Sequence, residues 1–348
     1  MSKMASNAVL TKTRAMFGQR LTEQNYRELL ALGTVPEVAD YLKSRTHYAS
    51  ILTDVRDMAM NRRNLEHLLR GKLLRDLADL AQFERNVGEH FFEFIMLQGE
   101  IDQVLAFIRC YNAGRPEEYL FDAPDFFHLH SGLDLTALAQ ARTYDHFLEA
   151  CGSAWAAPIL KQFRPEDGQP VRYDAVEFEL DKQLYQRFFQ VVKDTFPKES
   201  ADEVRDILCL HIELDNLRKI YRAKKYYGAS ADTLRGQLFP YYFHLSKQKL
   251  DAIADAASAD EVLRMIGETA YGRYYDRKAF TYIDDYAMRV MFDICRKKLH
   301  LSSQPAAVVY SAVTLFQIEI DDIVNIIEGI RYQLKPEKIG EMMIMRTN

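Results

Sequence analysis

The sequence predicts an all-α protein. Apolar residues recur at steps of three and four, the spacing that places them on one face of an α-helix. The alternation of apolar and polar residues that marks a strand is sustained nowhere in the chain. The helical period is clearest near the end of the chain, in residues 308–334. It is also clear in two upstream stretches, residues 93–111 and 201–227. These observations favour a fold built from long amphipathic helices.

The first third of the chain begins with a predicted helix over residues 7–32. A turn follows, in which Thr34 with Glu37 three residues later forms a capping-box pattern that starts a second helix ending near Tyr48. Further helices are predicted over residues 65–83 and 89–111, and the Gly-Arg-Pro sequence at residues 114–116 ends the last of them.

The remaining two thirds of the chain have the same order of elements. The middle third has a leucine-rich start, a turn at Thr143, a helix toward Trp155, a Pro/Gly-rich loop and two helices. The last third has a capping box at Ser258 and Glu261 and two helices. In the middle third the leucine-rich start is residues 133–138, the loop is residues 163–170, and the two helices are residues 175–192 and 201–227, the second stopped by Gly228. In the last third the expected segments are residues 245–253, 281–299 and 308–334.

Three closing helices align on Glu100, Glu213 and Glu319. At five matching positions in each helix the residue is apolar, and each glutamate begins an acid-aliphatic-Asp triplet, which adds Asp102, Asp215 and Asp321. This recurrence predicts an internal triplication with repeats at residues 1–120, 121–238 and 239–348. The alternative is that helical bundles share such patterns without repetition, because every packed helix needs an apolar face.

Composition limits the class of protein. The chain of 348 residues carries 45 basic and 50 acidic side chains, a net charge of −5, which argues against a nucleic-acid binder. The four cysteines lie far apart with no C-x-x-C pair, so reduced cytosolic thiols are expected. The N-terminus lacks the unbroken apolar segment of a secretory signal, and the longest uncharged run, residues 301–318, is too polar to span a bilayer. Any membrane association is therefore expected to go through a partner.

Several motifs that suggest chemistry are incomplete. Residues 267–272 have the glycine spacing of a phosphate loop, but Arg273 and Tyr274 stand where Lys and Ser or Thr are required. His128 and His130 have no further ligand at metal-binding spacing, and there is no H-E-x-x-H motif. The repeated carboxylates lack the histidines of a di-metal site. We therefore expect no catalytic residue, no cofactor and no bound metal.

The most basic stretch mixes cations with aromatic residues. Its candidate contact residues are Arg218, Arg222, Lys224, Lys225 and Tyr226. Single-strand binders combine these residue types, but cations near a helix C-terminus also form solvated faces or stabilise the helix dipole. A surface for docking another protein is the interpretation that we prefer to nucleic-acid binding.

The triplet carboxylates also have two interpretations. Each glutamate borders an apolar stripe, so a partner arginine from another helix is expected to offset its desolvation and set the register of the helices. The alternative is acid-base or metal chemistry. Arg109 and Arg222 lie nine residues after their glutamates, too far along the same helix to be that partner.

These residues carry a family resemblance. The segment IELDNL at residues 212–217 leads to RAKK at 222–225, and IEIDDI at 318–323 leads to EGIRY at 328–332. Together with the opening helices from Leu21 to Tyr48, they resemble the C-type subunit family of V-type/archaeal-type ATPases, which is equivalent to the d-type subunit of the eukaryotic V-ATPase. The likeness covers about residues 7–344. One departure is Glu328, which stands where the first two copies have Arg.

The resemblance implies a funnel of three similar helical domains around a pseudo-threefold axis. It also implies a non-catalytic component, monomeric alone and present in one copy per complex, that sits on the cytoplasmic face of the membrane. Its partners would be the rotor-shaft subunits of D and F type and the proteolipid ring of the membrane rotor. The alternatives are an all-α enzyme that uses the repeated carboxylates and a general helical adaptor.

Overall fold

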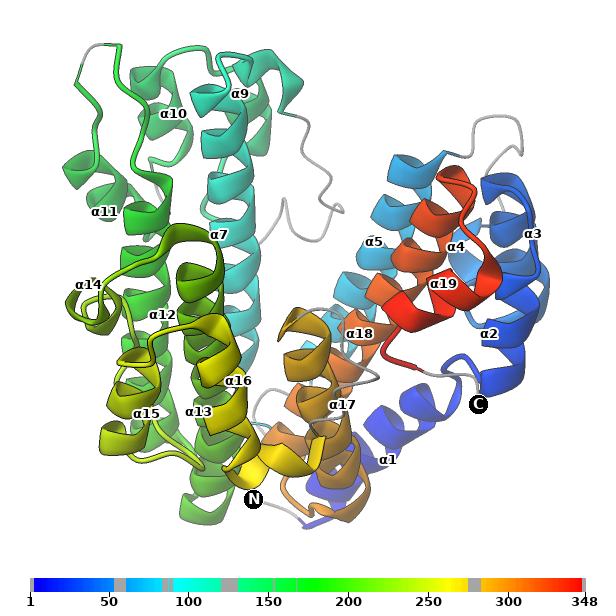
Figure 1. Cartoon of the computed structure of the whole chain (residues 1–348). Coiled ribbons are helices and arrows are strands. Elements are labelled where there is room, and N and C mark those ends of the chain that lie inside the picture. Colours follow the sequence, from blue (N-terminus) through cyan, green and yellow to red (C-terminus); the bar gives the residue numbers. More distant parts are fainter. Residues whose placement is uncertain are drawn as a thin grey trace. The chain divides into compact units, whose positions relative to one another are not determined.

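The computed structural model describes residues 3–52, 61–82, 87, 90–119, 131–152, 154–166, 168–274 and 283–345. Within these ranges every regular element is a helix and none is a strand, which confirms the all-α prediction (Figure 1). The elements, in chain order, are α1 (Lys3–Gly18), α2 (Glu23–Leu30), α3 (Val35–Arg45), α4 (Ala49–Leu52), α5 (Arg62–Ala81), α7 (Phe91–Asn112), η2 (Pro116–Glu118), α9 (Leu135–Gln140), α10 (Tyr144–Ala150), α11 (Ala157–Gln162), α12 (Tyr173–Thr195), α13 (Lys198–Arg222), η3 (Ala223–Tyr227), α14 (Ala231–Arg235), α15 (Lys247–Ala254), α16 (Ala259–Gly267), η4 (Ala270–Tyr274), α17 (Ile283–Leu301), α18 (Pro305–Arg331) and α19 (Pro336–Met342).

The chain divides into two compact units. Unit 1 contains Met1–Leu73 and Pro197–Asn348, and unit 2 contains Leu74–Phe196. One boundary lies within α5 and the other between α12 and α13. The division into three repeats at residues 120 and 238 stays a prediction.

Helix α18 is the core of unit 1. It packs against α1, α3, α13, α17 and α19. From Pro305 to Ile320 every side chain except the exposed Gln317 is buried, so the helix is covered on almost all sides. The sequence pattern predicted a single core-facing stripe, and the buried surface is wider because neighbours surround the helix.

Unit 2 is organised by the pairing of α7 with α12. The Phe94 and Phe188 rings stack with centroids 3.9 Å apart, and Phe107 stacks on Phe147 at 4.7 Å. The five matching apolar positions of α7, α13 and α18 are all buried, at most 9% exposed. The helical period therefore identified the core faces correctly. Leu334, predicted at the end of the α18 stripe, is 38% exposed and lies beyond the helix, which ends at Arg331.

The predicted helix over residues 7–32 is in fact two helices, α1 and α2. The break occurs because Thr22 caps α2 through a capping box with Asn25, and the extended backbone at Thr22 cannot continue a helix. The predicted caps Thr34 and Ser258 each accept the N–H three residues on, as expected, and Thr143, predicted as a turn residue, does the same. Gly228 adopts a left-handed conformation with φ of 58° and ends η3, where a side chain would be strained.

Candidate functional site

The three aligned glutamates are buried in the interiors of their units. Glu100 on α7 is 3% exposed, Glu213 on α13 is 0% exposed and Glu319 on α18 is 4% exposed. A buried carboxylate destabilises the fold unless hydrogen bonds replace the water that it loses. The partners of each glutamate therefore show what the residue does in the fold.

Glu213 has the most complete set of partners. Its Oε2 accepts the backbone N–H groups of Phe243 at 2.8 Å and Leu245 at 3.1 Å. Its Oε1 accepts the N–H of His244 at 3.1 Å and the hydroxyl of Tyr271. Burial and the neighbouring Glu213 carboxylate raise the pKa of Tyr271 well above its ordinary value, so this hydroxyl remains a donor.

Glu319 makes the same contacts with the start of the chain. Its Oε2 accepts the N–H of Leu21 at 2.8 Å and its Oε1 accepts the hydroxyl of Tyr48 at 2.9 Å. The Nε2 of His47 lies 3.7 Å from Oε1. Because burial lowers the pKa of His47 to about 4, the imidazole is neutral at pH 7 and forms no ion pair with Glu319.

Glu100 has fewer partners. Its Oε1 accepts the hydroxyl of Ser131 at 2.8 Å and the N–H of Gly132 at 2.6 Å. Its Oε2 is buried and has no hydrogen-bond partner within the described ranges, and the same is true of the indole Nε1 of Trp155. Trp155 follows the helix cap Thr143 in its segment, as Tyr48 follows the cap Thr34 and Tyr271 follows the cap Ser258 in theirs.

The segments that meet the glutamates have a common plan. In each, a leucine precedes the cap of a short helix, and the leucines Leu21, Leu133 and Leu245 are evenly spaced, since 133 − 21 and 245 − 133 are both 112. A second short helix follows. The residues about one and two turns after the cap of this helix are 0% exposed in every segment. They are Val38 and Leu42 in the first segment, Phe147 and Cys151 in the second, and Val262 and Ile266 in the third. We call each pair of short helices a two-helix module and each set of glutamate contacts a glutamate clamp.

Two of the three clamps join a long helix to the module that follows it in sequence. Glu100 holds the module that contains α9 and α10, and Glu213 holds the module that contains α15 and α16. Glu319 has no module after it and holds the first one, which contains α2 and α3. Among the described residues, no arginine lies within ion-pair distance of these glutamates. Their hydrogen bonds come from backbone N–H groups and from the hydroxyls of Ser131, Tyr271 and Tyr48.

A second polar residue, three positions after each glutamate, holds a downstream segment. Asn216 exchanges two hydrogen bonds with the backbone of Phe239, at 2.9 and 3.0 Å. Asp322 accepts the N–H groups of Ile344 at 2.7 Å and Met345 at 2.9 Å. Gln103 on α7 accepts the hydroxyl of Tyr119 at 2.7 Å. Sequence reasoning missed these residues, although their constant offset from the glutamates was a usable signal.

The second acids of the triplets are not equivalent. Asp102 is exposed on α7. Asp321 pairs with Arg70 of α5 at 3.0 Å, with both side chains 46% exposed. Asp215 is largely buried, which opposes its ionisation, but His211 and Arg218 outweigh this effect and hold the pKa at about 2.

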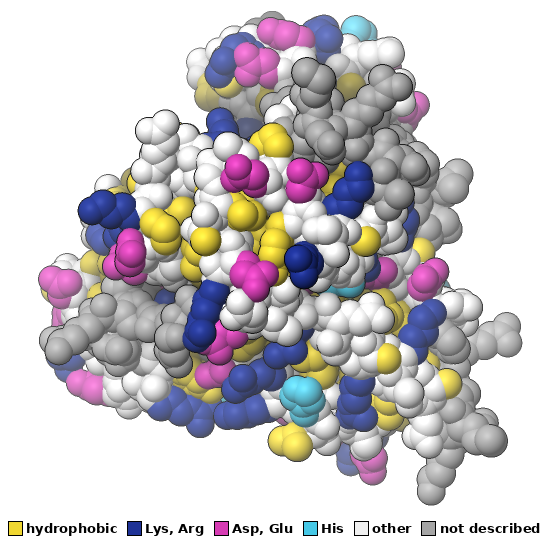
Figure 2. All heavy atoms as spheres, turned by 90° about the vertical axis from the view of Figure 1, so that its right-hand side faces the viewer, with side chains coloured by type: hydrophobic (Ala, Val, Ile, Leu, Met, Phe, Trp, Pro, Cys, Tyr) yellow, Lys and Arg dark blue, Asp and Glu magenta, His cyan; other side chains and the backbone are white. Residues whose placement is uncertain are grey.

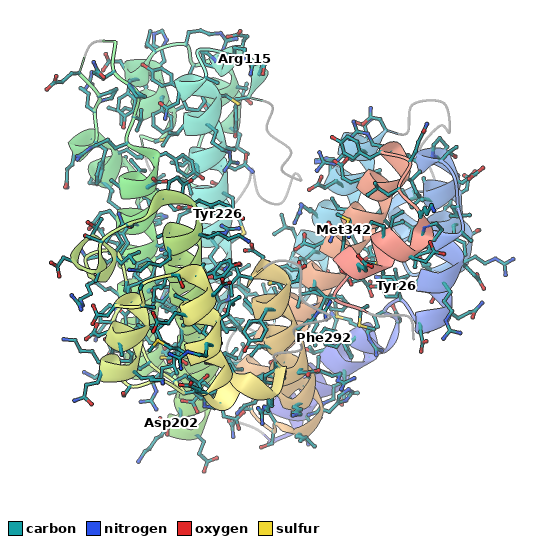
Figure 3. The ribbon with its side chains drawn as sticks, viewed as in Figure 1. Tyr26, Arg115, Asp202, Tyr226, Phe292 and Met342 are labelled. Atoms are coloured by element: carbon teal, nitrogen blue, oxygen red, sulfur yellow. The ribbon has the colours of Figure 1, made fainter. Side chains whose placement is uncertain are left out.

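The basic stretch divides into a paired part and an exposed part. Arg218 and Arg222 both contact Asp284, at 3.5 and 2.7 Å, so these two arginines join α13 to α17. Beyond them the backbone forms the π-helical turn η3, which carries Tyr226 (Figure 3). Tyr226 is 60% exposed and Tyr227 is 81% exposed. Lys225 is exposed and donates to Tyr221, and Lys224 is half-buried. Lys224, Lys225 and Tyr226 all lie in η3, and the contact role of the five predicted residues stays a prediction.

The apparent phosphate loop has a structural explanation. A Cβ added at Gly272 would lie 2.0 Å from the carbonyl oxygen of Gly267, so close backbone packing requires glycine there. His128 and His130 lie outside the described residues. Among those described, no group of three or more His, Cys, Asp or Glu side chains is placed to hold a metal ion.

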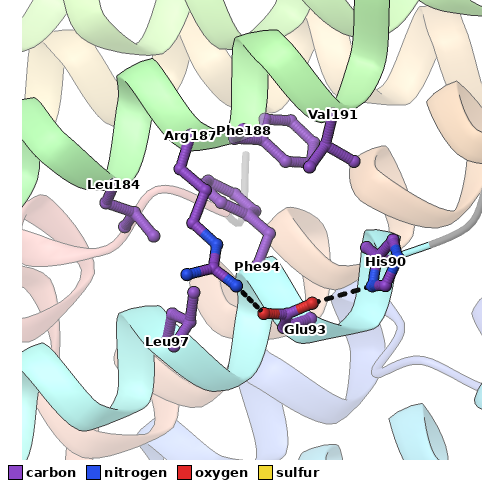
Figure 4. Close-up of a pocket in the computed structure, with 8 residues that line it drawn as sticks. All are labelled: His90, Glu93, Phe94, Leu97, Leu184, Arg187, Phe188 and Val191. Atoms are coloured by element: carbon purple, nitrogen blue, oxygen red, sulfur yellow. Dashed lines mark hydrogen bonds and ion pairs between the residues drawn. The ribbon is translucent and has the colours of Figure 1, made fainter. Parts of the chain in front are cut away.

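A shallow pocket lies between α7 and α12 in unit 2. Its floor is apolar, with Phe94 and Phe188 among its lining residues (Figure 4). Glu93 at its edge pairs with Arg187 and with Nδ1 of His90, the latter at 2.9 Å.

None of the described helices is long and apolar enough to cross a bilayer. On the face in Figure 2, Lys and Arg side chains are interspersed with Asp and Glu.

A search of curated proteins finds no significant match to the chain. The model of one protein family, described as the ATP synthase (C/AC39) subunit, matches residues 9–342. That range spans both units and includes all three glutamate clamps and modules. This chain therefore belongs to the ATP synthase (C/AC39) subunit family.

Proposed function

We propose that this chain is the central-stalk coupling component of a rotary V/A-type ATPase. In this role it is a socket that links the rotor shaft to the membrane rotor ring and transmits torque between ATP hydrolysis or synthesis and ion transport. It performs no catalysis itself. It acts on the cytoplasmic face of the membrane, as one copy bound to D- and F-type shaft subunits and to the proteolipid ring.

The observation that carries this proposal is the set of three glutamate clamps. A part that transmits torque must resist local unfolding, and local opening begins where buried contacts are few. Each clamp places a buried carboxylate across the junction between a long helix and a two-helix module, where the backbone N–H groups would otherwise lack partners. Because the last clamp closes onto the first module, the plan supports three similar domains around a pseudo-threefold axis.

The exposed end of α13 and η3 is the proposed docking surface. Tyr226 carries a large aromatic area outside the fold, and Lys225 lies 5.6 Å from its ring. Tyrosine is among the residue types that most often dominate the binding energy of protein interfaces. The paired Arg218 and Arg222 serve the fold, so the contact is assigned to Lys224, Lys225 and Tyr226.

The test is reconstitution. The purified chain is mixed separately with the shaft subunits and with the detergent-solubilised ring, and complexes are resolved by size-exclusion chromatography. Binding to both is expected, and failure to bind either contradicts the proposal.

Within that assay the double variant Lys224→Glu, Lys225→Glu is expected to weaken binding to one partner by about tenfold or more, since reversing interfacial charge is strongly unfavourable. Lys161→Glu, an exposed charge reversal on α11, is the matched control. Equal binding by both variants would remove these lysines from the contact. A stoichiometric metal in the purified protein would instead favour an enzyme.

A further inference from the structure

In two of the long helices, the residue nine positions after the glutamate is an arginine that contacts the first turn of another helix. Arg109 of α7 donates to the hydroxyl of Tyr173, the first residue of α12, at 2.9 Å. Arg222 of α13 pairs with Asp284, in the first turn of α17, at 2.7 Å. The first contact lies within unit 2 and the second within unit 1. A cation near the end of each of these long helices therefore receives the start of a neighbouring helix.

The same position in α18 is Glu328, and it makes an equivalent contact with the charges reversed. Its Oε1 lies 2.7 Å from Nε of Arg62, the first residue of α5. Figure 1 shows α5 beside the end of α18. We propose that the charge at this position selects which helix docks on the end of each long helix, and that its reversal in α18 gives that place to α5. This selection is a property of the chain itself and does not depend on the partners that it binds.

Local helix preferences oppose the charges at the α18 contact. The helix dipole favours anions near the N-terminus of a helix and cations near its C-terminus. Arg222 and Asp284 follow this rule, since Arg222 is the last residue of α13 and Asp284 lies in the first turn of α17. Arg62 and Glu328 both break it, since Arg62 begins α5 and Glu328 lies in the last turn of α18. Because neither charge suits its own helix, the contact between the two helices is what favours them.

The pair formed by Glu328 and Arg62 belongs to a series of ion pairs along α5 and α18. Successive members alternate in sign and lie between 2.7 and 3.2 Å apart, in the order Asp321, Arg70, Glu66, Arg62, Glu328 and Arg331. A single exposed ion pair contributes little to stability, whereas a network contributes more. Each of these side chains is between 22% and 46% exposed, so salt should weaken the network.

The reversed signs penalise incorrect pairings of the helices. If the start of α5 met the end of α13, Arg62 would face Arg222. If the start of α17 met the end of α18, Asp284 would face Glu328. Like charges that meet at an interface are strongly unfavourable and exclude wrong partners. Burial of the apolar face of α5, where Leu65 and Leu69 are 0% exposed, supplies stability but would discriminate poorly between similar helices.

Hydrogen exchange of the full-length protein tests whether the sign of the charge matters. Glu328→Gln removes the charge, and Glu328→Arg supplies the one that α7 and α13 carry. Protection of the amides of residues 66–73 in α5 should fall in the order unsubstituted protein, Glu328→Gln, Glu328→Arg, with a loss of about tenfold for the last. Adding Arg62→Glu to Glu328→Arg should recover part of this loss. The recovery is partial because Arg331 and Glu66 would then lie beside like charges.

Asp145→Arg, which reverses an exposed ion-paired charge in unit 2, is the control and should leave the protection of α5 unchanged. The difference between Glu328→Gln and Glu328→Arg should shrink in about 1 M salt, where screening is strong. A difference that persists undiminished in salt would overturn the proposal, because shape rather than charge would then decide the docking.

Equal protection in Glu328→Gln and Glu328→Arg also overturns the proposal, as does a double variant that is no better protected than Glu328→Arg. If Glu328→Arg does not fold, Arg62→Glu should be less protected than Arg62→Gln, and equal protection of these two contradicts the selection by charge. Because no partner is present, the result is independent of reconstitution with the shaft and ring.

Discussion

The clamps of α13 and α7 lie at matching positions on their helices but differ in their hydrogen bonding. Glu213 accepts four hydrogen bonds that use both of its oxygens. Glu100 accepts two through one oxygen, and the other has no partner among the described residues. A tyrosine completes the first clamp, and Trp155 stands at the matching place in the second. The carboxylate position is thus common to both helices, while the strength of each clamp depends on the residue that faces it.

Alanine substitution of the two glutamates is expected to give the largest effect, and it should affect stability differently in the two clamps. Glu213→Ala leaves three backbone N–H groups without an acceptor and should lower the free energy of unfolding by roughly 3–5 kcal/mol. Glu100→Ala strands only one N–H group and one hydroxyl, and should lower it by roughly 1–3 kcal/mol. Urea unfolding followed by circular dichroism measures both, and amide exchange shows whether unit 1 or unit 2 is destabilised.

Glu213→Gln is the control, because it keeps the shape of the side chain and one acceptor oxygen. It should lose less stability than Glu213→Ala. If Glu100→Ala is as destabilising as Glu213→Ala, the number of hydrogen bonds is not what distinguishes the two clamps.

The aspartates that end the triplets of α13 and α7 should differ in how their contributions to the free energy of unfolding depend on pH. Asp215 has its pKa held at about 2, below the value of an unfolded chain, so its contribution is present above about pH 4 and is lost as pH falls toward 2. Asp215→Asn should therefore lower the free energy of unfolding by about 2 kcal/mol at pH 7. Asp102→Asn, an exposed position on α7, should change it by less than about 0.5 kcal/mol.

The measurement is the free energy of unfolding as a function of pH. The unsubstituted protein should lose stability between pH 4 and pH 2 more steeply than Asp215→Asn does. Parallel curves for the two proteins would show that Asp215 has the same pKa folded and unfolded.

The smallest effect concerns the aromatic partner. A double-mutant cycle of Tyr271→Phe with Glu213→Gln should give a coupling energy of about 1 kcal/mol, because the cycle isolates their hydrogen bond. The matching cycle of Trp155→Phe with Glu100→Gln should give less than about 0.5 kcal/mol, since no hydrogen bond joins those residues. Equal coupling in both cycles would mean that the indole and carboxylate interact in solution.

Much of the fold was predictable from local patterns. The five matching apolar positions of α7, α13 and α18 are buried as the helical period required, and the predicted caps Thr34 and Ser258 cap their helices. Thr143, predicted as a turn residue, also caps a helix. Division of the predicted first helix into α1 and α2 was missed, because the cap at Thr22 lies inside a continuous helical pattern.

The candidate site was only partly predictable. The recurrence of Glu100, Glu213 and Glu319 was visible, but their partners were expected to be arginines. Backbone N–H groups carry no sequence signal, so a carboxylate that binds them looks the same in sequence as one that binds a cation. Arg218 and Arg222 were grouped with Lys224 because all are basic, although Asp284, more than sixty residues away, engages the two arginines.

The sequence by itself determined the helical class, the core faces and the positions of the repeated carboxylates, because these follow from spacing along one chain. Tertiary structure alone decided which module each glutamate holds and that Glu319 returns to the first. That choice depends on contacts across nearly 300 residues, which local periodicity does not encode. It also decided that Asp215 lies beside His211 and Arg218, which hold its pKa at about 2.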